Sequence, residues 1–431
     1  MSNFVFVLDT NKQPLDPVTP GLARRMLTQG KAAVYKRYPF TIIIKYSCDK
    51  PLTKPHEIKL DPGSKTTGLA ILQGGNKVIW AAELVHRGNQ ITGDLASRAA
   101  IRRNRRNRKT RYRQPRFLNR TRTPGWLPPS LASRVSNIVT WVNRLRRYVP
   151  VTSISQELVK FDTQAMLAPE ISGIEYTQGE LAGYEIRQYL LEKWGRKCAY
   201  CGIKNTPLEV EHIHPKSKGG SSRVSNLTLA CRNCNLAKGN RHITDFLSEK
   251  PDILSRVLKF ACLPLKDAAA VNSTGWSLFE KLQQTGLPVT TGTGGRTQYN
   301  RTRMGLPKTH WMDAACVGKV EQLVILTKQP LLITAKGWGN RQMCTPNKYG
   351  FPNKHRTRCK TFFGFQTGDM VRAVLPIGKF AGTHVGRLAV RESGVFDLRT
   401  AWGKISPVRH KYCTIVHRND GYMYGFSTLV R

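Results

Sequence analysis

Acidic residues are scarce in this sequence. The 431-residue chain has 27 Asp and Glu against 69 Lys and Arg, which gives a formal net charge of +42. A chain with so few carboxylates repels itself unless a polyanion neutralises it, so we expect nucleic acid as its partner. The hydrophobic content of 40% is ordinary, and the length allows two or three compact domains rather than one.

Long hydrophobic runs are also lacking. No apolar stretch approaches the roughly 20 residues that a membrane-spanning helix needs. The first ten residues lack the basic start of a signal peptide. We therefore expect no membrane partner and a cytoplasmic location.

Cysteines are too few for a disulfide framework: the chain has ten, of which four form two Cys-x-x-Cys pairs. The pairs are Cys198 with Cys201, and Cys231 with Cys234. Two short knuckles at this separation can present four thiolates tetrahedrally to one Zn²⁺, and a closed four-thiolate shell leaves no open position for chemistry. We expect a structural zinc site. The other six cysteines have no paired spacing and are expected to be buried or free thiols.

The distribution of apolar residues predicts a mixture of helices and strands. Near the start, short strands surround a helix with Thr19 as its cap, Pro20 at its first position and Gly30 beyond its end. Helices are further predicted over residues 131–148, 183–194 and about 308–327. Strands are predicted over residues 4–8, 32–35, 40–46, 78–83, 151–158 and 331–334, on either side of a turn within 57–72, and as a small β-barrel or curled sheet within 365–431.

Between the two cysteine pairs lies a polar segment with Glu211-His212-Ile213-His214-Pro215, and Asn235 directly follows the last cysteine. This segment resembles the HNH nuclease motif, a ββα-metal fold with flanking zinc knuckles. The resemblance implies that His212 is the general base, that Glu211 and Asn235 hold one Mg²⁺, and that Asn226 braces the loop. Most members of that family carry Asp where Glu211 stands, so the side chain is longer here by one methylene.

Three separated carboxylates stand at or near the ends of predicted strands or on a helix. Asp61 follows the strand before the glycine turn, Glu157 ends the strand at 151–158, and His310 and Asp313 are three apart on one helix face. In this order they resemble the three motifs of RuvC and other RNase H-like nucleases, with the HNH segment inserted between the second and third. The resemblance implies that Asp61, Glu157 and Asp313 hold two Mg²⁺ and that His310 positions or deprotonates water.

Residues 98–122 contain twelve Lys or Arg and no acid. A helix here would carry like charges four residues apart and needs phosphates around it, while a disordered basic segment is the alternative. The segment resembles the bridge helix of CRISPR type II effectors and their transposon-encoded relatives. In those proteins arginines grip the guide RNA, which implies RNA binding by Arg102, Arg103, Arg105, Arg106 and Arg108.

The order of these features resembles the IscB family over essentially the whole chain. That family's first module is named for Pro-Leu-Met-Pro, and residues 14–17 here are Pro-Leu-Asp-Pro. The expected fold is multidomain α/β, a split RNase H-like (RuvC) domain with an inserted ββα-metal HNH domain, a small N-terminal α+β module and a C-terminal β-rich module. The expected boundaries are 1–54 for the N-terminal module, 55–94 for RuvC part I, 95–125 for the bridge helix, 126–178 for RuvC part II and a linker, 179–252 for HNH, 253–358 for RuvC part III and a loop, and 359–431 for the C-terminal module.

The IscB resemblance implies an RNA-guided endonuclease. Its partners would be a structured guide, or omega, RNA and a double-stranded DNA target with a flanking motif that the C-terminal module contacts. HNH would cut the guide-paired strand and RuvC the displaced one. We expect one copy of the chain in the ribonucleoprotein, in a prokaryotic cytoplasm and associated with the nucleoid.

Two other classes remain open from the residues alone. An unguided homing or junction-resolving endonuclease would use the same two nuclease centres with specificity read by the protein. A non-catalytic RNA-binding or transposition accessory protein would carry degenerate centres, but the seven expected catalytic positions are all chemically competent. Cleavage of a cognate site by RNA-free protein would establish the first.

Overall fold

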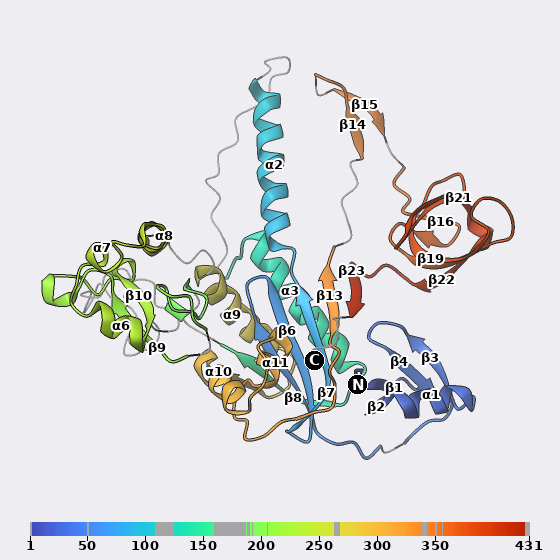
Figure 1. The fold of residues 1–431 in the computed structure, drawn as a ribbon. Helices are drawn as coiled ribbons and strands as arrows, with labels where there is room; N and C mark the ends of the chain where they lie inside the picture. Colours follow the sequence, from blue (N-terminus) through green and yellow to red (C-terminus); the bar gives the residue numbers. More distant parts are fainter. Residues whose placement is uncertain are drawn as a thin grey trace.

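The computed structural model describes residues 2–49, 51–107, 125–158, 187, 190–191, 193–204, 206–262, 268–337, 343–349, 351–355 and 357–426. Within these residues the chain is a mixed α/β protein (Figure 1). It has several separate hydrophobic cores. None of the described helices is long and apolar enough to cross a membrane.

An eight-stranded sheet lies at the centre of the molecule, with the strand order β11-β8-β5-β6-β7-β13-β23 and β12 paired with β7 outside that path. Strands β5, β6 and β7 form an antiparallel meander, and β8 and β11 continue the sheet parallel to β5. The strands are β5 (His56–Pro62), β6 (Thr66–Gln73), β7 (Lys77–Val85), β8 (Val151–Glu157), β11 (Val289–Gly292), β12 (Val324–Ile325), β13 (Leu331–Ala335) and β23 (Tyr422–Phe426).

The two faces of the sheet carry different helices, as the alternation of side chains along a strand requires. Ile58, Leu60 and Leu69 face one core, where α3 (Pro129–Arg146) packs through Trp141 and its apolar neighbours. This confirms the helix predicted over residues 131–148. On the opposite face, a second core joins strand residues such as Ala70 to α11 (His310–Ala315).

The helix expected over about 308–327 is wrong in its extent. Helix α11 ends at Ala315 with Cys316 as its cap, and β12 follows at Val324–Ile325. Gly318 has a φ of +80°, in the left-handed region that a helix does not use. The prediction ran too far because the apolar residues keep a helical spacing beyond the point where the backbone turns.

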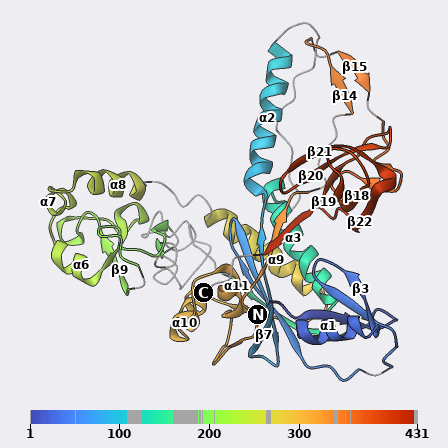
Figure 2. The ribbon, with the colours of Figure 1, turned by 45° about the vertical axis from the view of Figure 1, so that its right-hand side comes forward.

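Two folded units are inserted into the sheet between strands that pair directly. The first lies between β8 and β11 and contains β9 (Leu208–His212), β10 (Leu227–Cys231) and the helices α6 (Arg232–Lys238), α7 (Ile243–Phe246) and α8 (Pro251–Cys262). It has its own core and is followed by α9 (Ala268–Gln283), which contacts α3. In Figures 1 and 2 this unit lies to one side of the sheet.

The second insertion lies between β13 and β23. Its main part is a five-stranded antiparallel sheet in the order β21-β20-β19-β18-β22, which confirms the expected curled sheet. Its strands are β14 (Cys344–Pro346), β15 (Pro352–His355), β16 (Thr361–Phe362), β17 (Phe365–Gln366), β18 (Met370–Leu375), β19 (Gly382–Ala389), β20 (Val395–Thr400), β21 (Gly403–Arg409) and β22 (Cys413–His417).

The boundary expected for the C-terminal module, residues 359–431, runs too far. Strand β23 leaves that module and pairs antiparallel with β13 of the central sheet. Tyr422 and Tyr424 on β23 pack their rings against Trp141 of α3, at 5.7 and 6.1 Å between centroids. The burial of these large rings against α3 favours the central sheet over the smaller one.

The N-terminal module is a four-stranded sheet in the order β2-β1-β4-β3 with one helix, α1 (Pro20–Thr28). The Thr19 side chain caps α1 by accepting a hydrogen bond from the Leu22 N–H, as predicted. The strands are β1 (Val5–Leu8), β2 (Pro14–Val18), β3 (Ala32–Lys36) and β4 (Thr41–Ile44). Strand β2 was not predicted because it contains two prolines, which an edge strand tolerates.

Helix α2 (Gly88–Asn107) projects from the sheet between the two inserted units, as both views show (Figures 1 and 2). It begins ten residues before the basic run expected at 98. None of its described side chains is buried, so the helix has no core of its own. Arg108 and the rest of the run to residue 122 lie outside the described residues.

Candidate nuclease centres and nucleic-acid interface

The four expected zinc ligands meet in the unit inserted between β8 and β11. The sulfurs of Cys198, Cys201, Cys231 and Cys234 all lie within 4.8 Å of one another. The Cys201 and Cys231 sulfurs are 3.7 Å apart. A tetrahedron with Zn–S bonds of about 2.3 Å has edges of about 3.8 Å, whereas a disulfide needs about 2.05 Å. The residues therefore fit a zinc ion.

Secondary structure positions these thiols. Cys231 ends β10 and caps α6, and Cys234 lies in the first turn of that helix. Burial alone would raise the pKa of Cys198, but backbone hydrogen bonds outweigh it and lower the pKa to about 7. The thiolate is the form that binds metal, so the backbone favours ligation at this position.

The loop after β9 is braced as expected. The Asn226 side-chain oxygen accepts a hydrogen bond from the His214 N–H at 2.8 Å, and its amide donates to the carbonyls of His214 and Ser221. A Cβ at Gly220 would lie 2.0 Å from the His214 carbonyl oxygen, so only glycine allows this close approach. The loop is therefore fixed relative to β9 and β10, and His212 at the end of β9 is fixed with it.

Glu211 is buried and fully engaged. Its Oε1 lies 2.6 Å from Nζ of Lys238, and its Oε2 accepts a hydrogen bond from the Tyr200 hydroxyl at 2.5 Å. The Lys238 ammonium also donates to the His212 carbonyl oxygen. A buried carboxylate requires such compensation, and here an ammonium supplies the positive charge that a metal ion would otherwise bring.

The other expected Mg²⁺ ligand of this centre faces a different partner. The Asn235 amide donates to Oε2 of Glu209 at 2.6 Å. Glu209 and Glu211 are two apart on β9, and Asn235 and Lys238 are three apart on α6, so two parallel contacts join the strand to the helix. Glu211 and Asn235 thus each contact a different partner in this structure, and that they together hold one Mg²⁺ stays a prediction.

His212, in the same centre, has a ring nitrogen without a hydrogen-bond partner in the described part of the chain. Its ring Nε2 is enclosed and has no hydrogen-bond partner among the described residues. Burial lowers the pKa of His212, and of the nearby charges Glu211 raises it while Lys216 and Lys238 lower it. The neutral imidazole is therefore favoured, which is the form that can accept a proton.

The second centre stands at one end of the central sheet. Leu60 on β5 pairs with Gln156 on β8, so the next residues, Asp61 and Glu157, lie at the same end of these neighbouring parallel strands. The His310 ring nitrogen Nδ1 lies 4.0 Å from Oδ2 of Asp61. The sheet and α11 thus bring three of the four predicted residues together from points about 250 residues apart in sequence.

A glycine seats α11 on the sheet. Gly68 on β6 pairs with Asp61, and a Cβ there would lie 1.8 Å from the His310 carbonyl oxygen. The buried Lys59 ammonium donates to the Val317 carbonyl oxygen at 2.8 Å, just beyond the end of α11. These two contacts fix the start and the end of the helix and so set where His310 points.

Asp313, one turn along α11, is ion-paired with Arg301 of α10 (Gly294–Arg303), with 2.7 Å between Nε and Oδ1. Burial raises the pKa of Asp313, and the Arg301 guanidinium lowers it without cancelling that effect. His, Cys, Asp and Glu are the side chains that could hold a metal ion, and among the described residues only the four cysteines bring three or more such ligand atoms close enough together. The carboxylates of Asp61, Glu157 and Asp313 are not that close here.

A strongly basic cleft opens beside this centre. A cavity of about 1230 Å³ lies between α10 and the residues before β9. Among the described residues that line it, Glu321 is the one acid, and the cations are Arg187, Arg196, Lys204, Arg296, Arg301, Arg303, Lys308 and Lys319. Such a concentration of positive charge favours a phosphate backbone.

Sequence families match two parts of the chain. Residues 5–179 match the RRXRR protein family, and residues 102–106 on α2 read Arg-Arg-Asn-Arg-Arg. Residues 198–241 match the HNH endonuclease family and span the cysteines, β9, β10 and α6. The chain contains an HNH endonuclease domain. No curated protein matches it.

Solved Cas9 structures resemble the chain weakly. Streptococcus thermophilus Cas9 in complex with the AGAA PAM shares 15% identity at a TM-score of 0.22, over 61% of this chain and 32% of that one. The Type II-C Cas9 of Actinomyces naeslundii shares 17% at 0.17, over 41% and 23%. These scores are too low to bear on how the domains are arranged, and the chain spans a third or less of either protein.

Several residues of the two centres were not predicted. Tyr200 lies inside the first Cys-x-x-Cys knuckle, and Lys238 and Glu209 flank the motif residues, so their proximity in sequence was a usable signal. Arg301 lies twelve residues before Asp313 on a helix that was not predicted. Nothing in the sequence indicated that its guanidinium would meet that carboxylate.

Proposed function

We propose that this protein is an RNA-guided, double-stranded DNA endonuclease of the IscB type. In this proposal the HNH domain cuts the strand paired to the guide RNA, and a split RuvC-like domain, formed by β5–β8, β11 and α11, cuts the displaced strand. The HNH endonuclease match supports the nuclease activity. The match to the RRXRR family and the net charge of +42 support a nucleic-acid partner bound along α2.

One observation carries the RuvC part of the proposal. Asp61 and Glu157 lie at the same end of neighbouring strands of one sheet, His310 approaches Asp61, and the HNH domain is inserted between β8 and β11, which pair directly. This order of motifs along the chain and this meeting in space are what the resemblance to RuvC implies. The resemblance further implies that Asp61, Glu157 and Asp313 hold two Mg²⁺, which would neutralise charge on the phosphate, and for this the three carboxylates would have to come closer together than they lie here.

The residues of this chain have separate tasks in the proposed cleavage. His310 is half exposed beside Asp61, so it can orient the attacking water and accept its proton. Asp313 is ion-paired with Arg301, and that guanidinium also lines the basic cleft where a phosphate backbone would lie. In the HNH domain, His212 is the proposed general base, because burial lowers the pKa of its ring and so favours the neutral form that accepts a proton.

The remaining parts of the proposal concern recognition. Base pairing would read the target, α2 would bind the guide RNA through Arg102, Arg103, Arg105 and Arg106, and the β18–β22 sheet would contact the flanking motif. The protein would act as one copy per RNA in a prokaryotic cytoplasm, on the nucleoid.

Co-expression of the chain with its flanking genomic DNA tests the proposal. We expect a specific structured RNA to co-purify, and the complex to cut a DNA duplex that matches the variable part of that RNA. RNase treatment before the assay should abolish cutting. Cutting of a fixed site by RNA-free protein would instead establish an unguided nuclease.

A further inference from the structure

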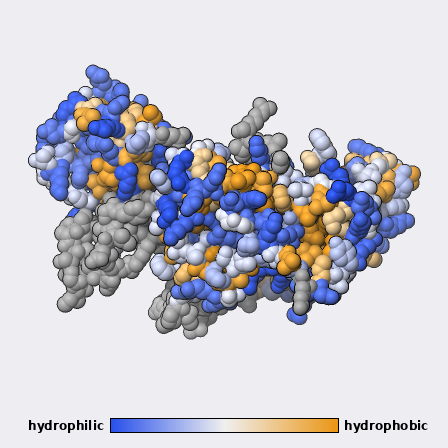
Figure 3. Space-filling view, turned by 90° about the horizontal axis from the view of Figure 1, so that it is seen from below, coloured by the Kyte–Doolittle hydropathy of each residue, from blue (hydrophilic) through white to orange (hydrophobic). Residues whose placement is uncertain are grey.

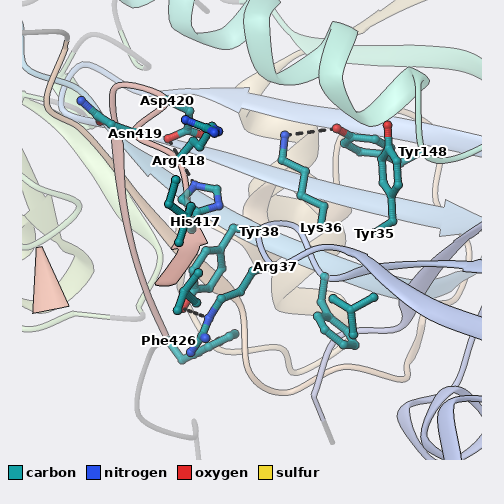
Figure 4. Close-up of a pocket in the computed structure, with 14 residues that line it drawn as sticks. Tyr35, Lys36, Arg37, Tyr38, Tyr148, His417, Arg418, Asn419, Asp420 and Phe426 are labelled. Carbon is teal, nitrogen blue, oxygen red and sulfur yellow. Dashed lines mark hydrogen bonds and ion pairs between the residues drawn. The ribbon is translucent and has the colours of Figure 1, made fainter. Parts of the chain in front are cut away.

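A groove separates the N-terminal module from the strands that return from the C-terminal insertion. It encloses about 970 Å³, within the range of about 300–1,000 Å³ typical of small-ligand sites. One wall is β3 with the loop to β4, and the other is the end of β22, the loop after it and the end of β23. Figure 4 shows both walls, with Tyr38 and His417 between them.

Aromatic rings are exposed along this groove. Tyr35 is 41% exposed, Phe40 is 40% exposed and Phe426 is 53% exposed, and all three line the cavity. Large apolar side chains are normally buried, so three exposed rings around one hollow indicate a surface that stacks on something. Seen from below, apolar side chains gather in patches near the middle and in the right-hand half of the molecule (Figure 3).

Two of the rings that line the groove, Tyr35 and Tyr38, pack against other rings. Tyr38 stacks on Tyr424, with 4.5 Å between ring centroids and 14° between planes, and meets His417 edge-on. Tyr35 contacts Tyr148 edge-on, and the Tyr148 hydroxyl accepts a hydrogen bond from the Lys36 ammonium at 3.2 Å. A ligand that stacks in the groove would therefore find its platform in place.

The charge of the groove is positive. Lys36, Arg37 and Arg418 line it, and Asp420 is the one acidic residue among the described lining residues. The Asp420 carboxylate is already paired with Arg144, at 2.8 Å, so it does not repel an anion strongly. Exposed rings interleaved with cations are the combination that binds unpaired nucleotides, since bases stack on rings and phosphates pair with the cations.

We propose that this groove binds unpaired nucleotides of RNA by stacking on Tyr35 and Phe40. The inference rests on the proposed function, which supplies the guide RNA as the ligand. It adds a second RNA contact away from α2. The position of the groove favours RNA over the DNA strands that are cut. The groove adjoins β23, at the opposite edge of the sheet from β11, whereas both nuclease centres lie on or beyond β5, β8 and β11. A DNA strand can reach either centre without crossing the groove.

Binding of a short, unstructured oligoribonucleotide to the full chain, freed of nucleic acid, tests the proposal. The logarithm of the affinity is measured against the logarithm of the salt concentration. Tyr35→Ala with Phe40→Ala should weaken binding roughly 5- to 150-fold at every salt concentration, the loss expected for one stacked base. The slope should stay the same, because no phosphate contact is removed.

Matched variants separate stacking from charge and from folding. Tyr35→Phe should retain the affinity, since it keeps the ring. Arg37→Gln should instead reduce the salt slope by about one. Tyr46→Ala removes a ring of the same module that is 56% exposed but does not line the groove, and it should change nothing. Thermal unfolding of each variant identifies any loss that comes from a damaged fold.

Three results would overturn the inference. The first is an unchanged affinity in the Tyr35→Ala, Phe40→Ala chain with a normal melting temperature. The second is an equal loss in Tyr46→Ala. The third is an oligodeoxyribonucleotide of the same sequence that binds as tightly and depends on the two rings as strongly, which would assign the groove to DNA. None of these measurements uses DNA cleavage. A failure of the groove proposal can therefore be told apart from a failure of the proposed RNA-guided cutting.

Discussion

Lys238 on α6 and Glu211 on β9 form a buried ion pair, with 2.6 Å between the ammonium nitrogen and Oε1 and at most 6% exposure of either side chain. Because one buried charge without its partner costs far more than a paired one, the two residues stabilise the HNH domain only as a pair. In this pair, Lys238 contacts the Glu211 carboxylate, which by the resemblance to the HNH motif would hold a metal ion.

Removing one member of this pair should be costly. Lys238→Met is expected to destabilise the HNH domain by about 3–5 kcal/mol, because Glu211 is left buried and unpaired. Adding Glu211→Gln to that variant should recover much of the loss. Hydrogen exchange of the β9 and α6 amides in the full chain measures both effects. Lys259→Met, at an exposed position of α8, is the control and should leave exchange unchanged.

Gly68→Ala should displace the start of α11. The new Cβ would lie 1.8 Å from the His310 carbonyl oxygen, and a clash with backbone is not relieved by a side-chain rotation. We expect a stability loss of about 1–3 kcal/mol and loss of displaced-strand cutting, with HNH cutting retained. Gly21→Ala, which meets nothing within 4 Å, is the matched control. Wild-type cutting of both strands by Gly68→Ala would contradict the proposed role of α11.

Strand-specific cutting separates the two centres. Asp61→Asn should abolish cutting of the displaced strand only, and His212→Ala should abolish cutting of the guide-paired strand only. Each variant would then nick a supercoiled plasmid that the unaltered complex makes linear. If either substitution stopped cutting of both strands while RNA binding stayed normal, two independent centres would be ruled out.

Zinc should be bound by the cysteine cluster and by no other thiol. Cys201→Ser is expected to remove the metal and unfold the HNH domain, because a structural zinc site contributes directly to folding. Cys262→Ser changes an exposed cysteine outside the cluster and should retain the metal. Elemental analysis of purified protein measures the zinc content. Equal zinc in both variants would refute the assignment.

Acid should weaken the attachment of β23. Burial opposes ionisation of Asp420, but hydrogen bonds from His417 and Tyr424 and the charge of Arg144 prevail and lower its pKa from 3.8 to about 2. A carboxyl with a depressed pKa stabilises the folded chain fully above its unfolded pKa. This stabilisation, about 2 kcal/mol, is lost as the pH falls from about 4 to about 2.

Unfolding of the full chain, monitored through tryptophan fluorescence as a function of pH, measures that loss. Asp420→Asn should lower stability at pH 7 and should make the stability loss between pH 4 and pH 2 smaller by about 2 kcal/mol. The difference between the two chains isolates Asp420 from the other carboxyls that titrate in this range. An unaltered acid response in Asp420→Asn would show that the pair with Arg144 contributes no pH dependence.

Local patterns in the sequence predicted the elements that depend on neighbouring residues. The Thr19 cap, the helix at α3, the strand that ends at Glu157 and the two cysteine knuckles were all visible, because capping, amphipathic spacing and metal spacing are short-range properties. Prediction failed where a distant contact decided the outcome. The helix after His310 ends early, and β23 joins the central sheet instead of the smaller one.

The sequence by itself determined that the chain is basic, holds an HNH segment with two Cys-x-x-Cys pairs and carries four candidate residues of a second centre. The tertiary structure decided which of those residues meet and what they meet. It set His310 beside Asp61 and Arg301 on Asp313, and it joined Glu211 to Lys238. The physical reason is that a buried charge is stable only with a partner, and the partner is chosen by the packing of strands and helices from distant parts of the chain.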